Sequence, residues 1–237
     1  MLFRSSSGNL LMFYLGLELS TIPLAALCNF DLEKKISGEA AMKMIMMSAF
    51  ASCLLLLGIS FVYGTSGTLS MQVLSVTFGN SPLHMFALIL LMAGFGFKIS
   101  AAPFHLWTAD VYEGAPAGVT AYLSVISKGA VLFVMTSVLY NTFRMMEDIW
   151  YQLLFMLAVA TMVIGNLFAL RQTNIKRMLA FSSIAQVGFI LTGMSGANDA
   201  GHTSVIYFVL VYLFSNLGAF GVISVVSAAT EIGRAHV

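Results

Sequence analysis

The sequence has little charge and few residues suited to holding a cofactor. Only 9% of its 237 residues are charged, whereas a soluble domain carries about 25%. No basic run indicates nucleic acid as a partner. No dinucleotide-type glycine fingerprint, Walker loop or HExxH motif occurs. The two cysteines, Cys28 and Cys53, both lie in apolar segments, which excludes an iron–sulfur cluster and a disulfide framework. The sequence therefore predicts no bound cofactor and no metal in this chain.

The sequence is rich in apolar residues, which make up 59% of it. They form runs of bilayer length, about 20 residues each, separated by charged or Gly/Ser/Asn-rich breaks. The predicted spans cover residues 9–30, 41–63, 83–101, 116–142, 150–170, 178–196 and 203–229. The fold class expected is all-α, a polytopic membrane bundle of about seven helices with no strands.

Basic residues are distributed unevenly between the two sides of the predicted bundle. If the helices alternate in direction, one side receives Lys34, Lys35, Lys43, Arg171, Lys176 and Arg177, and the other receives Arg4 and Arg144. By the positive-inside rule the first side faces the cytoplasm. The only charged residues of the segment "TADVYEG", on the same side, are acidic.

Three ionisable residues, Glu18, Lys98 and Lys128, fall inside the apolar runs. A charge at the bilayer centre costs about 2.5–3.5 kcal/mol on insertion scales, so such residues normally face the bundle interior and mark a functional site. Two structural alternatives stay open. Lys98 could extend to an interface, or Glu18 and a lysine could form a purely structural ion pair.

Helical spacing favours inward orientation for all three residues. Small or polar residues three and four positions apart share one helix face and mark contacts between membrane helices. Three such stripes are Tyr14, Glu18, Thr21 and Ala25; Gly94, Lys98 and Ala101; and Ala117, Ala121, Ser124 and Lys128.

Pro103 predicts a break in the third apolar segment, because proline removes a backbone donor and disfavours helix at the residue before it. Broken membrane helices near a charge recur at transporter ion sites. A buried lysine beside a carboxylate can take up and release a proton as their separation changes. Lys98 and Lys128 are therefore predicted stations of a proton relay, with His105 as a weaker member.

Three stretches carry a resemblance to a known family: "LMFYLGLELSTIPLAAL", "FGFKISAAPFHLWTADVYEGAPAGVTAYLSVISKGA" and "RQTNIKRMLAFSSIAQVGFIL". They resemble the antiporter-like membrane subunits of bacterial NADH–quinone oxidoreductase, respiratory complex I, and among these the N-subunit family. The segment "PFHLWTADVYEGAP" is the most specific part, because its "DVYEGAP" resembles N subunits, whereas L and M subunits and Mrp-type antiporters usually continue differently after the tryptophan.

The resemblance implies a function and a role for each buried charge. Glu18 matches the membrane glutamate that pairs with the lysine of the broken helix, Lys98 matches that lysine, and Lys128 matches the relay lysine of the next helix. It also implies a proton-translocating subunit in the bacterial inner membrane, among other membrane subunits of complex I. The complex would use NADH, flavin, iron–sulfur clusters and quinone, held outside this chain.

The match to this family is incomplete in length. Family members have about fourteen membrane helices in two inverted repeats, about twice the number predicted here. We therefore interpret the sequence as an internal fragment, with residues 1–230 a partial antiporter-like domain. The last residues, "EIGRAHV" (231–237), resemble a translated sequencing adapter and are expected to be non-native.

Other functions compete with the proton-pumping subunit. A subunit of an Mrp-type cation/proton antiporter is the main alternative, and "DVYEGAP" argues against it. A helical scaffold without transport does not account for three inward charges beside a broken helix. A seven-helix receptor is excluded because the helix number reflects truncation.

Overall fold

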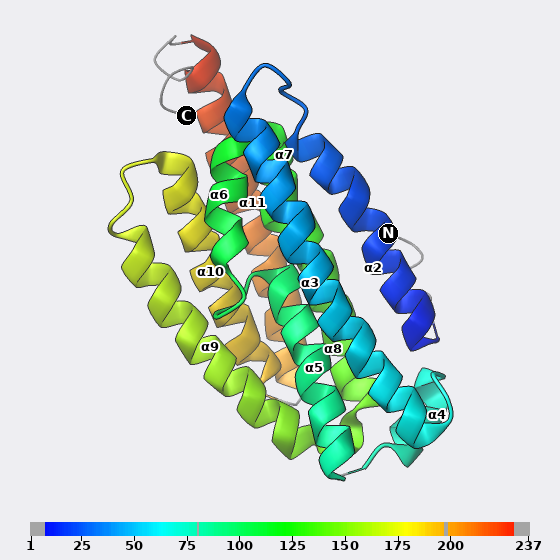
Figure 1. Cartoon of the computed structure of the whole chain (residues 1–237). Helices are drawn as coiled ribbons and strands as arrows, with labels where there is room; N and C mark the ends of the chain where they lie inside the picture. Colours follow the sequence, from blue (N-terminus) through cyan, green and yellow to red (C-terminus); the bar gives the residue numbers. More distant parts are fainter. Residues whose placement is uncertain (1–7, 80, 197–198, 230–237) are drawn as a thin grey trace.

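The computed structural model describes residues 8–79, 81–196 and 199–229, which form a bundle of helices (Figure 1). Within these ranges the only strand-like pairing is a single bridge between Asn9 and Ser70. The elements are α2 (Leu10–Cys28), α3 (Lys35–Ser66), α4 (Met71–Thr77), α5 (Pro82–Ile99), α6 (Leu106–Gly114), α7 (Ala117–Tyr122), η1 (Leu123–Ser127), α8 (Lys128–Ser137), η2 (Val138–Thr142), η3 (Arg144–Met146), α9 (Glu147–Ala169), α10 (Ile175–Met194) and α11 (Asp199–Ala229). The predicted all-α bundle is confirmed.

Seven segments of the described chain are long and apolar enough to cross a membrane, as predicted. The second differs most from its prediction, because α3 begins at Lys35 rather than at residue 41. Its first three turns carry Glu39 and Lys43, which interrupt the apolar run without interrupting the helix. Two short helices, α4 and α6, were not predicted. Helix α6 lies within "PFHLWTADVYEGAP", a segment too polar to cross lipid alone.

Local capping sets the starts of three spans. At the start of α2 the Asn9 side chain accepts a hydrogen bond from Leu11 N. At the start of α5, Ser81 precedes Pro82, and its side chain accepts a hydrogen bond from His84 N. Asn174 accepts from two backbone N–H groups at the start of α10. Each cap satisfies donors that have no partner inside the helix, so these polar residues define where the apolar runs become helical.

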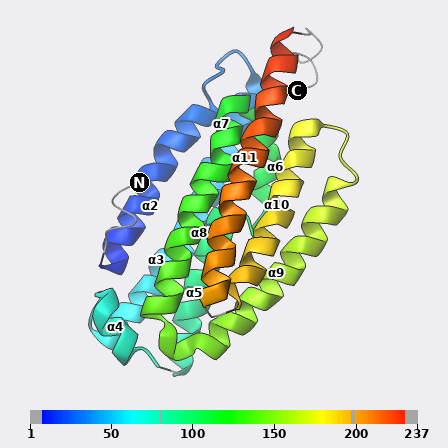
Figure 2. The ribbon, with the colours of Figure 1, turned by 180° about the vertical axis from the view of Figure 1, so that it is seen from behind.

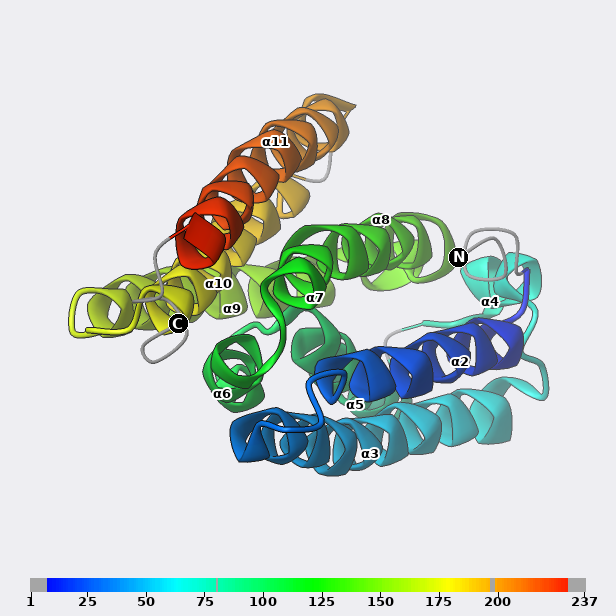
Figure 3. The same cartoon turned by 90° about the horizontal axis from the view of Figure 1, so that it is seen from above.

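The helices pack side by side along most of their length (Figures 1 and 2). Helix α3 runs the full height of the bundle, and α5 and α6 follow one another along it. Seen from above, α6 lies between α3 and α10, and α9 packs on α10 (Figure 3). Lipid provides no hydrophobic force between helices, so close contact of small residues is needed to hold them together.

The break predicted at Pro103 is present. Helix α5 ends at Ile99, and Ser100 adopts the left-handed conformation, with φ 64°, that closes many helix ends. Backbone groups in the break are satisfied by protein: Ala102 N donates to Thr161 Oγ1 at 3.0 Å, and Trp107 Nε1 donates to Phe97 O at 3.2 Å. Non-helical backbone inside a membrane protein is tolerated only when it is paired in this way.

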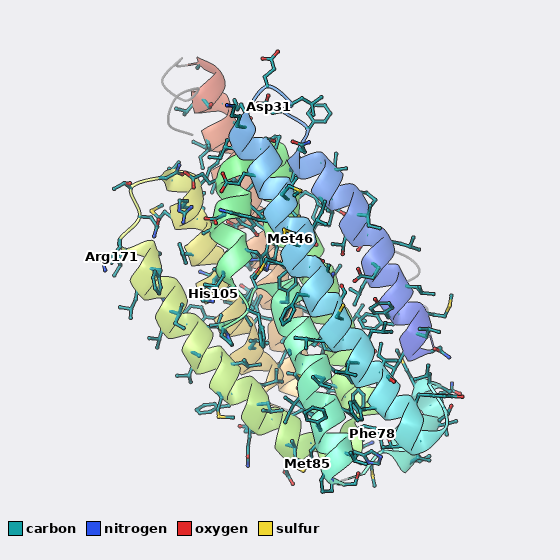
Figure 4. The ribbon with its side chains drawn as sticks, viewed as in Figure 1. Asp31, Met46, Phe78, Met85, His105 and Arg171 are labelled. Atoms are coloured by element: carbon teal, nitrogen blue, oxygen red, sulfur yellow. The ribbon has the colours of Figure 1, made fainter. Side chains whose placement is uncertain are left out.

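The charged loops gather at one end of the bundle. Asp31, in the loop before α3, and Arg171, in the loop before α10, lie at the same end, while Phe78 and Met85 lie at the other (Figure 4). Arg144 precedes α9 and therefore lies at the end opposite Arg171. The side of the membrane that each end faces stays a prediction. Arg4 and residues 231–237 lie outside the described residues.

Candidate functional site

Lys98 and Glu18 form an ion pair between α5 and α2. Lys98 Nζ lies 3.2 Å from Glu18 Oε1, and the side chains are 8% and 26% exposed. Lys98 occupies the last turn of α5, directly before the break. An ammonium group here also faces the C-terminal, electronegative end of its own helix. The chain thus places a basic group of limited exposure at the point where a membrane helix is interrupted.

Three hydroxyl side chains complete the surroundings of the pair. Lys98 Nζ donates to Thr21 Oγ1 at 2.9 Å and to Ser48 Oγ at 3.1 Å, and Ser52 Oγ donates to Glu18 Oε1 at 2.6 Å. Beside Lys98 is a cavity of about 20 Å³ that extends to Ser127 of the neighbouring helix. That volume holds about one water molecule. Lys98 can therefore exchange Glu18 for hydroxyl or water partners without leaving its pocket.

Lys128 lies in a second polar site, apart from the first pair. It follows directly on η1, a short π-helical segment of the kind often found at functional positions. Its Nζ donates to Ser183 Oγ of α10 at 2.8 Å and lies 5.3 Å from the centre of the Tyr112 ring of α6. In the described part of the chain no carboxylate lies within 4 Å of it. Hydroxyl and aromatic groups, rather than an opposite charge, hold this amine.

His105 lies at the end of the break, at mid-height in the bundle (Figure 4). Its side chain is buried, its ring packs edge-on against Phe181 of α10, and its Nδ1 atom has no hydrogen-bond partner among the described residues. Of the four predicted site residues, the structure thus pairs Glu18 with Lys98. Lys128 contacts Ser183 and the Tyr112 ring, and His105 contacts Phe181.

A network of charges fastens α6 at the end where the charged loops gather. Asp110 Oδ2 lies 2.7 Å from Lys43 Nζ of α3, and Asp110 Oδ1 lies 2.7 Å from Arg177 Nη1 of α10. The same Arg177 atom lies 2.6 Å from Glu113 Oε2. The acidic residues of "TADVYEG" are thus neutralised by basic residues from two other helices, which explains acids on the predicted positive side.

Most of the hydroxyl side chains that hold Glu18, Lys98 and Lys128 were not identified from the sequence. Thr21 lay on the Glu18 stripe, but Ser48, Ser52 and Ser183 were not singled out. Ser48 and Ser52 are four residues apart in an apolar run, and this spacing is the signal that could have identified them. No comparable pattern marks Ser183 or Tyr112.

The sequence profile of the family described as "NADH:quinone oxidoreductase/Mrp antiporter, TM" matches residues 7–235. The chain belongs to this family. Within the NADH:quinone oxidoreductase/Mrp antiporter family, the NADH-quinone oxidoreductase subunit N of Azobacteroides pseudotrichonymphae is 50% identical over 231 residues. That match covers 98% of this chain and 48% of the relative. The chain spans about half the length of the curated relatives it matches.

Two solved structures have the same fold as this chain. A chain of respiratory complex I from Thermus thermophilus is 32% identical, with a TM-score of 0.79, over 94% of this chain and 48% of that one. A chain of the Mrp complex from Dietzia is 23% identical, with a TM-score of 0.84, over 92% of this chain and 41% of that one. The second likeness is one of fold alone. The bundle is therefore a multi-pass membrane protein of the bacterial inner membrane.

Proposed function

We propose that this chain is part of a proton-translocating membrane subunit of an NADH:quinone oxidoreductase. Glu18, Lys98 and Lys128 are the proton-relay residues, and His105 is a weaker member. The observation that carries the proposal is the Glu18–Lys98 pair at a broken membrane helix. Placing charges at this depth costs about 2.5–3.5 kcal/mol each, which favours a functional role over a decorative one.

The surroundings of Lys98 support a switch rather than a fixed bridge. Its ammonium group has two neutral acceptors, Thr21 and Ser48, besides the Glu18 carboxylate. When Lys98 moves away from Glu18, the hydroxyl groups continue to accept its hydrogen bonds. The loss of the carboxylate favours release of a proton from the ammonium, and return of the carboxylate favours uptake.

The energy for pumping comes from other subunits in this proposal. The chain has no motif for NADH, flavin, iron–sulfur clusters or quinone, so these groups are placed elsewhere in the complex. Its partners are other membrane subunits of the complex and the lipid bilayer. The assignment to NADH-quinone oxidoreductase rather than to an antiporter rests on the subunit N relative, which is 50% identical to this chain over 231 residues.

The test uses the full-length protein in its native complex. Inverted membrane vesicles are supplied with NADH, and their acidification and electron-transfer rate are measured together with assembly of the complex. We expect Lys98→Ala to lower acidification while the complex stays assembled. Lys35→Ala, at an exposed position at the start of α3, is the matched control and should pump normally. Equal pumping without Lys98 would show that this lysine is structural.

The same vesicles separate the main alternative, a subunit of an Mrp-type cation/proton antiporter. The fold likeness to the Dietzia Mrp chain is the observation in its favour. If NADH drives no acidification, but an imposed sodium gradient is exchanged for protons, the antiporter assignment holds and the proposed one is wrong.

A further inference from the structure

Trp107 joins the two sides of the helix break. It lies in the first turn of α6, and its indole N–H donates to the carbonyl of Phe97, in the last turn of α5, at 3.2 Å. The rings of the two residues also pack together, with their centroids 5.3 Å apart. Trp107 is only 6% exposed, and a hydrogen bond shielded from water is stronger than one at the surface. One side chain thus holds α6 to α5 by a hydrogen bond and by a ring contact.

The end of α5 leaves an acceptor position open for this bond. Ser100 N donates to Phe97 O at 3.0 Å, and Ala101 N donates to Gly96 O at 2.8 Å, which closes the helix. A carbonyl oxygen has two lone pairs, so Phe97 O can accept from the indole of Trp107 as well. The indole bond is therefore added to a helix end that the backbone has already closed. What it fixes is the position of α6 against that end.

The bonded carbonyl lies directly beside Lys98. Phe97 precedes Lys98 in the last turn of α5. Trp107 also lines the cavity of about 20 Å³ beside Lys98, together with Thr21 and Ser48, which accept hydrogen bonds from the ammonium group. Thr21 and Ser48 belong to α2 and α3, and Trp107 is the residue that α6 contributes to this wall. A shift of Trp107 would change both the turn that carries Lys98 and the pocket around it.

The other end of α6 is anchored by charged groups of α3 and α10. Asp110 contacts Lys43 of α3 and Arg177 of α10, and Lys176 Nζ donates to the Ala115 carbonyl just after the helix at 3.2 Å. Helix α6 is therefore fixed at both ends. Trp107 is its attachment at the end that faces the break.

We propose that Trp107 is a positioning residue for Lys98, whose indole N–H holds the last turn of α5 where the ammonium group reaches Glu18. The inference deepens the proposed proton relay and rests on it. Trp107 acts through the Phe97 carbonyl and through the pocket wall, and it does not itself carry a proton. When the indole bond is lost, the last turn of α5 is free to rotate. Lys98 then spends less time beside Glu18, and fewer protons are translocated per NADH.

The second tryptophan of the chain provides a matched control. Trp150 Nε1 donates to Phe143 O at 3.1 Å, and Trp150 is 1% exposed and lies at the start of α9. Trp107→Phe and Trp150→Phe therefore remove the same atoms and the same kind of bond. Both are made in the full-length protein in its native complex, and acidification of inverted vesicles is measured with electron transfer and assembly. We expect a several-fold lower proton yield per NADH for Trp107→Phe and the wild-type yield for Trp150→Phe. Equal yields in the two variants overturn the proposal.

A second measurement distinguishes positioning from a general loss of stability. The coupling between Glu18 and Lys98 is measured by a double-mutant cycle of thermal unfolding, with Glu18→Gln and Lys98→Met. In the Trp107→Phe background this coupling should fall to about half or less, and in the Trp150→Phe background it should be unchanged. A tryptophan that only packs would lower stability without altering the coupling. An unaltered coupling in the Trp107→Phe background therefore refutes the positioning role.

If Trp107→Phe prevents assembly, a closer replacement decides the matter. Benzothienylalanine keeps the two fused rings of tryptophan and has sulfur in place of the N–H group. Its incorporation in place of Trp107 should lower the proton yield several-fold. A wild-type yield would show that the ring alone is needed and that the hydrogen bond has no role.

The outcomes also separate this inference from the proposed function. If Lys98→Ala lowers the proton yield and neither replacement of Trp107 does, the relay stands and the positioning role is wrong. If Lys98→Ala pumps as wild type, the proposed function itself fails.

Discussion

Lys98 Nζ and Glu18 Oε1 lie 3.2 Å apart, although 80 residues separate them in the sequence. The contact joins the middle of α2 to the last turn of α5, directly before the break. Ser52 supports the carboxylate of this pair, and Ser48 supports its ammonium group. Their positions on one face of α3 make that helix the scaffold of the pair.

The first prediction concerns the coupling between these two charges. Removing Lys98 alone leaves the partly buried Glu18 carboxylate without an opposite charge beside it. Removing both charges leaves no buried charge to stabilise. We expect the full-length complex to be less stable to heat with Lys98→Met alone than with Glu18→Gln and Lys98→Met together. A double-mutant cycle should give a coupling of about 0.5–3 kcal/mol. Strictly additive losses would contradict the pairing.

The second prediction concerns the partner of Lys128. A hydrogen bond to a charged group contributes about 1.5–3 kcal/mol, so Ser183→Ala should slow proton transfer by about tenfold or more in NADH-driven vesicles. The neighbouring Ser182 is half-buried and lines a groove between α10 and α11, so Ser182→Ala is the matched control. A greater loss from Ser182→Ala than from Ser183→Ala would rule out this role for Ser183.

The third prediction concerns the packing of α9 on α10. A Cβ atom on Gly165 would lie 2.6 Å from Ala185 N, so the backbones of the two helices would have to separate. We expect Gly165→Ala to destabilise the subunit by about 1–3 kcal/mol, measured by thermal unfolding in detergent. Gly64 is exposed on α3 and has open space around it. Gly64→Ala should therefore leave stability unchanged or raise it.

The fourth prediction concerns the dependence of α6 on pH. Partial burial raises the pKa of the Asp110 carboxyl, but Lys43 and Arg177 outweigh burial and hold that pKa below its usual range. Glu39 and Glu113 also face these two basic groups. A carboxyl group whose pKa is lower in the folded than in the unfolded protein stabilises the fold fully at a pH above its unfolded-state pKa, about 3.9. That stabilisation is lost as the pH falls through the folded-state pKa.

Acid should therefore weaken the attachment of α6 to α3 and α10 below about pH 4. Asp110→Asn should remove this part of the pH dependence, measured as the midpoint of thermal unfolding of the full-length protein from neutral to acidic pH. Asp31→Asn, which affects an exposed pair with Lys34, should change the curve less, since such pairs contribute about 0–1 kcal/mol. A curve for Asp110→Asn identical to wild type would show that the network does not stabilise the protein.

Much of the fold could be predicted from the sequence because the bilayer imposes a strong requirement. A span needs about 20 apolar residues, and charges inside such a run are costly enough to stand out. Pro103 also marks the break directly. For these reasons the spans, the break and the inward charges follow from local patterns.

The contacts of the site could not be predicted in the same way. Serine and threonine are common in membrane helices, and nothing local distinguishes Ser183 from the adjacent Ser182. The pairing of Asp110 with Lys43 and with Arg177 joins residues 67 positions apart in each case. Such contacts depend on how the helices pack against one another, and the residue pattern within one helix carries no information about that packing.

The two relay lysines are fastened to different parts of the bundle. Lys98 is held by side chains of α2 and α3, and Lys128 is held by α10 and by the ring of Tyr112 on α6. Between α5 and α6 the chain passes through residues 100–105, which lack a continuous helical hydrogen-bond ladder. A movement of α10 would therefore act directly on Lys128 through Ser183 but not on Thr21 and Ser48, which hold Lys98.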